Sequence, residues 1–249
     1  MKGFTVIFRR ELAGLFLTPL AWVLLVAAVG LNGVQLIDVL IRSGGDVDLS
    51  FNYLLGIGPM FWILMAILPP LLTMRSISEE AKSGQLEFLL TAPVTDGAVV
   101  LGKHLAVCAF LAVLWAAVPV YGIVLELTGV SPDWGQLLLG YLGAVLVSAL
   151  FAGVGMMTSA ASSTPLLAAF LGLVLNLAIL LLPQLAGVVG GEVGSVLEPI
   201  AARLNLGEHL VYSFMRGAFD SADLVFFLAW TALFLFASVR LVEARRWWT

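Results

Sequence analysis

The sequence predicts an all-α, polytopic membrane protein with six transmembrane helices, and its composition and its patterning both indicate this class. Of the 249 residues, 61% are hydrophobic and 11% are charged, whereas soluble domains contain about 45–50% apolar and about 25% charged residues. The apolar residues gather in six continuous runs of the ~20 residues that a helix needs to cross a bilayer. The strands of a membrane barrel would instead alternate over ~10 residues, so these runs predict helices.

The six predicted spans cover nearly the whole chain, which we interpret as a single transmembrane domain over residues 1–249. Their approximate bounds are 19–40, 51–74, 98–127, 136–159, 165–187 and 222–241. A soluble enzyme is excluded because 12 Lys and Arg plus 16 Asp and Glu cannot coat a soluble surface. A net charge of −4 offers no basic face to nucleic acid. One cysteine and two histidines give no internal disulfide and no obvious metal site, so no cofactor is predicted.

The lysines and arginines predict the orientation of the bundle. Nine of the twelve lie near the two termini or around the 75–96 segment, and the other three are Arg42, Arg203 and Arg216. Lys and Arg are enriched in cytoplasmic segments. Both termini and the 75–96 segment are therefore predicted to be cytoplasmic.

The first 18 residues predict an amphipathic helix that lies in the cytoplasmic membrane interface and ends where the chain turns at Pro19. Its apolar positions recur at near-helical spacing and are Phe4, Ile7, Phe8, Leu12, Leu15 and Phe16, with Lys2, Arg9, Arg10 and Glu11 elsewhere. Such a helix suits the membrane surface. A positive anchor that only sets topology is an equally compatible interpretation.

The 75–96 segment predicts a short helix on the cytoplasmic surface between the second and third spans. Ser76 and Glu79 form a capping-box pattern that starts a helix, and Ser83-Gly84 ends it. The apolar face and the stop that follow are Leu86, Leu89, Leu90 and Pro93. Because its acidic start is poorly matched to anionic lipid, a protein partner is favoured over a helix that rests on lipid. Thr95 or Asp96 is expected to cap the third span.

The external 188–221 segment is long enough to have its own structure or function. Two helical faces are predicted, one made of Leu197, Ile200, Ala201 and Leu204 and one made of Leu210, Val211, Phe214 and Met215. We favour a cap or plug at the outer end of the bundle.

Small and polar residues within the spans predict how the helices pack. Every fourth residue of one stripe in the fourth span is small, and the stripe consists of Gly140, Ala144, Ser148 and Ala152. Such a stripe lets another helix approach closely, and packing is favoured over a transport pathway. Interhelical hydrogen bonds are expected at Asn32, Gln35, Ser148 and Asn176. Kinks or breaks are expected at Pro59, Pro69, Pro70 and Pro119.

Charged residues of the spans lie near span ends, where their side chains can reach the interface. They are Asp38, Lys103, Glu126, Asp223 and Arg240. This placement disfavours ion-coupled transport, which uses charges inside the membrane. The phosphate-binding pattern G-x-x-x-x-G-K-[ST] is absent from the sequence, so active transport would need another subunit as its energy source.

Four stretches together carry a family pattern. They are the lead-in with Arg10-Glu11 and Thr18-Pro19, PPLLTMRSISEEAKSGQLEFLLTAPVTDGAVVLGKHLA at 69–106, PDWGQLLLGYLG at 132–143 and VRLVEARRWW at 239–248. The second is the most specific, since an acidic pair precedes a Gly-x-Leu-Glu-x-Leu-Leu helix, a proline and a Leu-Gly-Lys sequence. On these stretches the chain resembles the ABC-2 permease family, the membrane subunits of type-2 ABC exporters. Its closest subgroup looks like the gliding-motility and copper-enzyme-maturation permeases.

The resemblance implies a non-catalytic permease subunit of an ATP-driven exporter in the bacterial inner membrane. It would pair with itself or a sister permease, contact membrane lipid and bind two cytoplasmic ATPase subunits, with no role for nucleic acid. Residues 84–93 would be the coupling helix, and 188–221 would be an external re-entrant pair. The implied ATPase-coupling interface is Glu79, Glu80, Gly84, Leu86, Glu87, Leu89, Leu90 and Pro93, and the stripe at 140–152 would serve helix packing or dimerisation. The family's acidic-then-basic pair corresponds to Glu79, Glu80 and Lys82, although Ala81 separates the two signs.

Two other functions stay open. A membrane scaffold that anchors a motility or assembly complex without transport needs the same spans. An ion-coupled carrier is disfavoured by the uncharged span centres.

Overall fold

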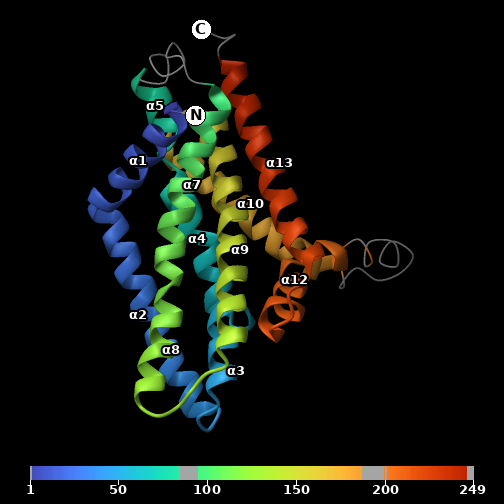
Figure 1. Cartoon of the computed structure of the whole chain (residues 1–249). Coiled ribbons are helices and arrows are strands. Elements are labelled where there is room, and N and C mark those ends of the chain that lie inside the picture. Colours follow the sequence, from blue (N-terminus) through green and yellow to red (C-terminus); the bar gives the residue numbers. More distant parts are fainter. Residues whose placement is uncertain (1, 85–94, 187–198, 200, 246–249) are drawn as a thin grey trace.

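The computed structural model describes residues 2–84, 95–186, 199 and 201–245, and all the elements in this part of the chain are helical (Figure 1). The first half contains α1 (Lys2–Leu17), α2 (Pro19–Arg42), α3 (Val47–Asn52), the π-helical turn η1 (Tyr53–Ile57), α4 (Pro59–Thr73) and α5 (Ser78–Ser83). The second half contains α7 (Asp96–Trp115), α8 (Ala117–Leu127), α9 (Trp134–Ala161), α10 (Pro165–Ala186), α12 (Leu206–Tyr212), the 3-10 turn η2 (Phe214–Arg216) and α13 (Ser221–Arg245).

Six helical stretches are long and apolar enough to cross a membrane, which confirms the predicted fold class. Four of them are the single helices α2, α9, α10 and α13. The second is composite, running from α3 through α4 into α5, and the third joins α7 to α8. The second stretch is longer than the apolar run predicts because polar residues at both of its ends, such as Asp48 and Lys82, are also helical.

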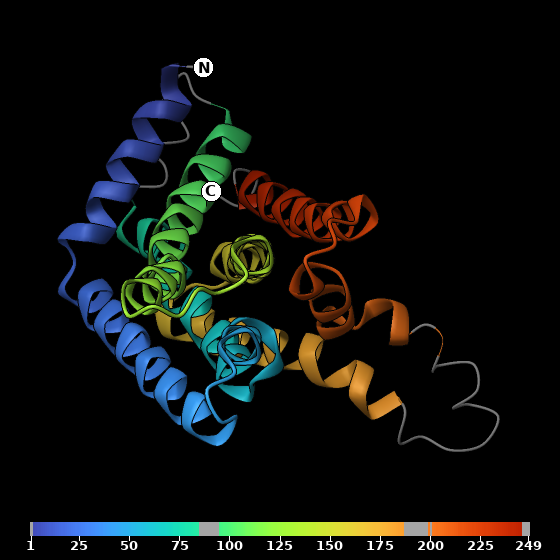
Figure 2. The same ribbon diagram turned by 60° about the horizontal axis from the view of Figure 1, so that its bottom comes forward.

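The helix α9 lies at the centre of the bundle, with α4, α7, α10 and α13 packed around it (Figure 2). About two thirds (67%) of its most apolar stretch is buried, against 17% for α2 and 22% for α10 and for α13. A helix buried on most sides must have small residues where its neighbours come closest. The exposed apolar faces of α2, α10 and α13 are left for lipid or for another subunit.

The small-residue stripe of α9 packs inside this chain. Gly140, Ala144, Ser148 and Ala152 are all buried. A Cβ atom added at Gly140 would lie 3.0 Å from Leu55 Cδ1 in η1, and the Ser148 hydroxyl lies 3.4 Å from Met65 Sδ in α4. The second and fourth spans therefore pack closely against each other along this stripe.

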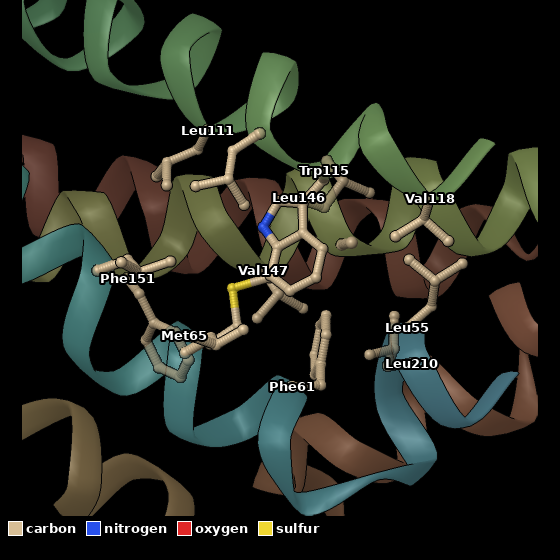
Figure 3. Close-up of a cluster of buried hydrophobic side chains, with 14 of the residues drawn as sticks. Leu55, Phe61, Met65, Leu111, Trp115, Val118, Leu146, Val147, Phe151 and Leu210 are labelled. Carbon is tan, nitrogen blue, oxygen red and sulfur yellow. The ribbon is translucent and has the colours of Figure 1, made fainter. Parts of the chain in front are cut away.

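Large side chains fill the space between α4, α7 and α9 (Figure 3). The Trp115 ring of α7 is fully buried and tilts against Phe61 of α4, with 5.1 Å between ring centroids. Phe151 of α9 and Met65 of α4 meet in the same cluster. Interdigitation of large side chains from three spans fixes their relative positions.

Prolines predicted to kink or break the spans differ in their effect. Pro59 occupies the first turn of α4, where it costs no hydrogen bond, and α7 ends at Trp115, four residues before Pro119. Pro69 and Pro70 stay inside α4 without ending it.

The carbonyl that Pro70 leaves without its helical partner is that of Ala66. Proline removes the N–H that would bond the carbonyl four residues earlier. The buried amide of Asn176, on α10, donates to Ala66 O at 3.4 Å. This bond confirms one predicted interhelical hydrogen bond. The Nδ2 of Asn32 instead donates within α2, to Ala28 O.

The segment α12–η2 inserts apolar side chains into the bundle from the side opposite to α5. Leu210, Phe214 and Met215 are almost completely buried. Glycines on the facing helices make the space, because a Cβ at Gly143 of α9 would lie 2.5 Å from Leu210 Cδ1 and one at Gly56 would lie 2.9 Å from Met215 Cε. We call these three side chains the wedge. It agrees with the apolar face expected at 210–215, whereas Leu197 and Ile200 lie outside the described residues.

Enlarging the central stripe should destabilise the protein. Ala144 is fully buried, and overpacking a close-packed core costs about 1–3 kcal/mol. We expect Ala144→Leu to lower the thermal unfolding midpoint in detergent. The matched control is Ala232→Leu, at an exposed position of α13, which should be nearly silent. Equal shifts for the two variants would contradict the placement of α9.

Candidate functional site

A buried ammonium group joins three helices at the end of the bundle where α1, α5 and the start of α7 meet. The Nζ atom of Lys103, on α7, lies 2.8 Å from Glu80 Oε1 on α5 and 2.9 Å from Glu11 Oε1 on α1. The Lys103 side chain is only 2% exposed. Its partners are 23 and 92 residues away in the chain, so these contacts hold distant segments together.

Arg10 completes this group, which we call the charge cluster: Arg10, Glu11, Glu80 and Lys103. Its Nη2 atom lies 2.6 Å from Glu11 Oε1 and 3.1 Å from Glu80 Oε1. Two positive and two negative charges balance one another. Balance matters because an unpaired charge taken out of water costs several kcal/mol, whereas a paired and hydrogen-bonded one costs far less.

The sequence-based expectation for Lys103 was wrong. A lysine near a span end was expected to extend toward the membrane interface, as snorkelling side chains do. Instead, α7 begins at Asp96, so Lys103 stands two turns inside the helix and faces α1 and α5. The carboxylates of Glu11 and Glu80 reach Lys103 there. Their negative charges offset the cost of removing the ammonium group from water.

The electrostatics of Glu11 follow from this packing. Burial alone raises the pKa of Glu11, but the charges and hydrogen bonds of Lys103 and Arg10 outweigh it, so the pKa lies below its usual range. In return, the hydrogen bond from Arg10 to Glu11 raises the pKa of Arg10 above its usual value. Both groups are therefore charged at neutral pH.

The start of α5 is tied to the end of α9 by one hydroxyl group. Ser159 Oγ accepts hydrogen bonds from the backbone N–H groups of Ile77 and Ser78, both at 3.1 Å, and donates to Met74 O at 3.2 Å. The expected capping box is wrong, because Ile77 and not Ser76 precedes the helix and makes no side-chain cap. The N–H groups of the N-cap residue Ile77 and of the first helical residue Ser78 are satisfied by α9 instead.

The eight predicted interface residues lie in four different settings. Glu80 belongs to the charge cluster, whereas Glu79 is 56% exposed, with its Oε2 3.8 Å from Arg75 Nε. Gly84 ends α5 with a left-handed φ of 75°, which favours glycine. The remaining five, Leu86, Glu87, Leu89, Leu90 and Pro93, lie outside the described residues. Beyond them, Thr95 caps α7 by accepting from Ala98 N at 3.3 Å, as expected.

A pocket of about 330 Å³ opens beside the charge cluster, between the α1–α2 corner and the α4–α5 corner. Glu11, Glu80 and Lys103 form part of its polar wall, and Leu15 and Leu72 belong to its apolar wall. Among the described residues, no group of three or more His, Cys, Asp or Glu side chains could hold a metal ion. The arrangement offers ion pairing between helices, with no catalytic constellation.

The sequence contains a signal for this cluster that hydropathy does not use. Arg10-Glu11 and the lysine of Leu101-Gly102-Lys103 lie in stretches that carry the family resemblance. Gly102 also explains the close approach of α1, because a Cβ there would lie 3.0 Å from Ile7 Cγ2. Matching the opposite charges of residues 1–18 with those of the third span would have predicted the contact of Glu11 with Lys103.

Fold and site together define a polytopic helical membrane protein whose α1, α5 and α7 are joined by buried ion pairs. The family model for ABC-2 family transporter proteins matches residues 26–245, so the chain belongs to this family. It is accordingly the membrane component of an ABC transporter, a generally non-catalytic subunit that partners ABC ATPases. A search of curated proteins found no match, and the motility and copper-maturation subgroup stays a prediction.

Removing the buried ammonium should destabilise the protein strongly. Lys103→Met leaves the carboxylates of Glu11 and Glu80 with Arg10 alone, and deleting one partner of a buried pair costs about 3–5 kcal/mol. The check is thermal or denaturant unfolding in detergent. Lys82→Met serves as the control because Lys82 is exposed on α5, and it should change stability by less than about 0.5 kcal/mol. Equal losses in the two variants would refute the burial of Lys103.

Acid should weaken the same cluster through Glu11. Because its folded-state pKa lies below the ordinary 4.5, the stabilisation is complete above that value and is lost as the pH falls through the lowered pKa. Glu11→Gln should therefore show a smaller loss of stability on acidification than the native protein. Glu79→Gln, at an exposed site, should follow the native curve. The pH dependence of the unfolding midpoint measures both.

Proposed function

We propose that this chain is the permease subunit of an ATP-driven exporter in the bacterial inner membrane. Two copies, or one copy and a sister permease, would work with two cytoplasmic ATPase subunits, and both termini would lie on the cytoplasmic side. Family membership supports the ATPase partnership, and the nine-to-three distribution of Lys and Arg supports the orientation.

The observation that carries this proposal is the bridge from Glu80 to Lys103. The 85–94 segment leaves α5 at Gly84 and enters α7 at Asp96, and the Glu80–Lys103 ion pair of 2.8 Å joins these two helices. A push on the segment therefore moves α5 and α7 together.

A movement of α5 and α7 would reach the rest of the bundle through two sets of contacts. The ion pair of Lys103 with Glu11 connects α7 to α1, which continues into α2 after Thr18. The hydrogen bonds of Ser159 connect the start of α5 to the central helix α9. Buried ion pairs and hydrogen bonds are short and directional, so these contacts transmit displacement better than a flexible loop would.

The segment 84–93 would be the coupling helix that the ATPase grips. Leu86, Leu89 and Leu90 would form its buried face and Glu87 its rim, with Pro93 ending it. ATP binding and release would then rock the two six-helix halves, provided that the helix contacts the two ATPase states differently. The exposed apolar faces of α2, α10 and α13 would face lipid and the second permease subunit.

Cross-linking tests the coupling helix. A cysteine at position 87, in a Cys108→Ser background, should cross-link to an ATPase subunit in at least one of its ATP-bound and empty states. Leu89→Ala should leave the protein folded but weaken ATPase binding about thirtyfold, the equivalent of about 2 kcal/mol at an interface hot spot. Glu87→Gln should have a smaller effect that salt reduces.

Absence of any cross-link in either state would overturn the coupling-helix proposal. A loss of folded protein in Leu89→Ala would instead mean that the leucine anchors the segment in the membrane. Candidate substrates separate the two remaining functions, because a transporter's substrate should stimulate the partner ATPase and a scaffold has none. A protonophore should stop an ion-coupled carrier only.

A further inference from the structure

A histidine outside the charge cluster links the wedge segment to the last span. His209, on α12, directs Nδ1 at Asp223 Oδ1 of α13 at 2.6 Å and Nε2 at the backbone oxygen of Arg203 at 3.0 Å. Its ring stacks on Phe226 of α13, with centroids 4.0 Å apart and planes 20° from parallel. The His209 and Asp223 side chains are 25% and 15% exposed, so neither is sealed inside the protein.

The two polar partners of this ring determine how many protons it holds. A backbone carbonyl only accepts hydrogen bonds, so Nε2 must carry a hydrogen. An ionised aspartate also only accepts, so Nδ1 must carry one as well. A neutral imidazole has a single N–H and can satisfy one of these acceptors. A neutral histidine beside an ionised aspartate is therefore one proton short of making both observed contacts.

We propose that His209 is a proton-operated latch, which holds α12 against α13 as an imidazolium and releases it when the proton leaves. The ring lies face to face with Phe226, an arrangement that also favours a cation. Histidine changes its charge between about pH 5 and pH 8. The latch thus responds to the pH that surrounds the 206–223 part of the protein.

The charged groups near the ring are mainly acidic. His209 lines a pocket of about 330 Å³ together with three acidic side chains: Glu208 from its own helix, Asp220 from the turn before α13, and Asp223. Asp220 Oδ1 accepts from Ala222 N, and Glu208 Oε1 accepts from the amide of Asn205. The Arg216 guanidinium, the cation of η2, lies over the Tyr212 ring, 4.8 Å from its centroid.

The latch acts on the wedge because the two are adjacent. Leu210 follows His209 directly and is fully buried against Gly56 and Gly143. Releasing His209 from Asp223 leaves the stack of the His209 ring on Phe226 as a weaker contact between α12 and α13. If α12 faces the outside, as proposed above, a low external pH would strengthen the contact between α12 and α13. The latch itself requires neither that orientation nor transport.

The proton count can be measured directly. The chain has two histidines, and His104 is a distinct reference, since its Nε2 lies 3.3 Å from Cys108 Sγ inside α7. In protein with ¹⁵N-labelled histidine, the His209 resonances are assigned by their loss in His209→Gln. At about pH 5 both His209 nitrogens should be protonated, and at about pH 8 one should be bare. A bare nitrogen at about pH 5 would overturn the proposal.

A matched variant converts the latch into a pH-independent contact. In Asp223→Asn the amide can donate to a bare Nδ1 while Nε2–H still bonds the Arg203 oxygen, so a neutral ring satisfies both contacts. We compare the thermal unfolding midpoints of the native protein and of Asp223→Asn at each pH. The advantage of the native protein should be about 2–4 °C smaller at about pH 8 than at about pH 5.

Glu126→Gln is the control, because Glu126 is an exposed carboxylate of α8 that does not line this pocket. It should keep the native pH dependence. If the native protein and Asp223→Asn depend on pH equally, the latch is refuted, and the contact is a fixed structural hydrogen bond.

Discussion

The end of the bundle where α1, α5 and α7 meet depends on the burial of one ammonium group. Lys103 is 2% exposed, and no apolar surroundings would stabilise its charge. The carboxylates of Glu11 and Glu80 must therefore come to it, and with them come α1 and α5. Arg10 then balances the second negative charge. Since ion pairs of this kind specify an arrangement more than they add stability, the cluster's main effect is to fix where three helices meet.

The rest of the bundle is arranged around α9, and its small residues decide which neighbours come close. Gly140 admits the side chain of Leu55, and Gly143 admits Leu210 and Phe214. Backbone groups freed by breaks in the spans have their own partners, since the Trp62 indole donates to Gly56 O at 2.8 Å and Asn176 donates to Ala66 O. Irregular backbone at membrane depth is tolerated in this way because neighbouring helices satisfy it.

Hydropathy predicts the spans because lipid imposes one requirement, ~20 apolar residues, on each of them. Helix ends and local caps such as Thr95 also follow from adjacent residues. The charge cluster does not, since Lys103 and Glu11 are 92 residues apart and no periodicity links them. The capping box expected at Ser76 is also missing: the helix starts after Ile77, and the N–H groups of Ile77 and Ser78 donate to Ser159, 81 residues beyond Ser78. Patterns of adjacent residues predict helix ends and caps, but they do not predict contacts made by side chains distant in the sequence.

The proposed coupling route and the proposed latch use different helices and different chemistry. In the charge cluster, two acidic and two basic side chains join α1, α5 and α7. In the proposed latch, the contact of His209 with Asp223 changes with the proton supply. On the two proposals, the charge cluster would give a firm link to the ATPase and the His209 contact a movable one.

The most direct test of the charge cluster is a double-mutant cycle between Glu80→Gln and Lys103→Met, read by unfolding free energy in detergent. Residues that share a buried ion pair have interaction energies of about 0.5–3 kcal/mol, whereas independent sites add to within about 0.3–0.5 kcal/mol. The account predicts a coupling above about 1 kcal/mol, with the double variant more stable than the sum of the single losses implies. Additive losses would contradict the Glu80–Lys103 bridge and the transmission route that depends on it.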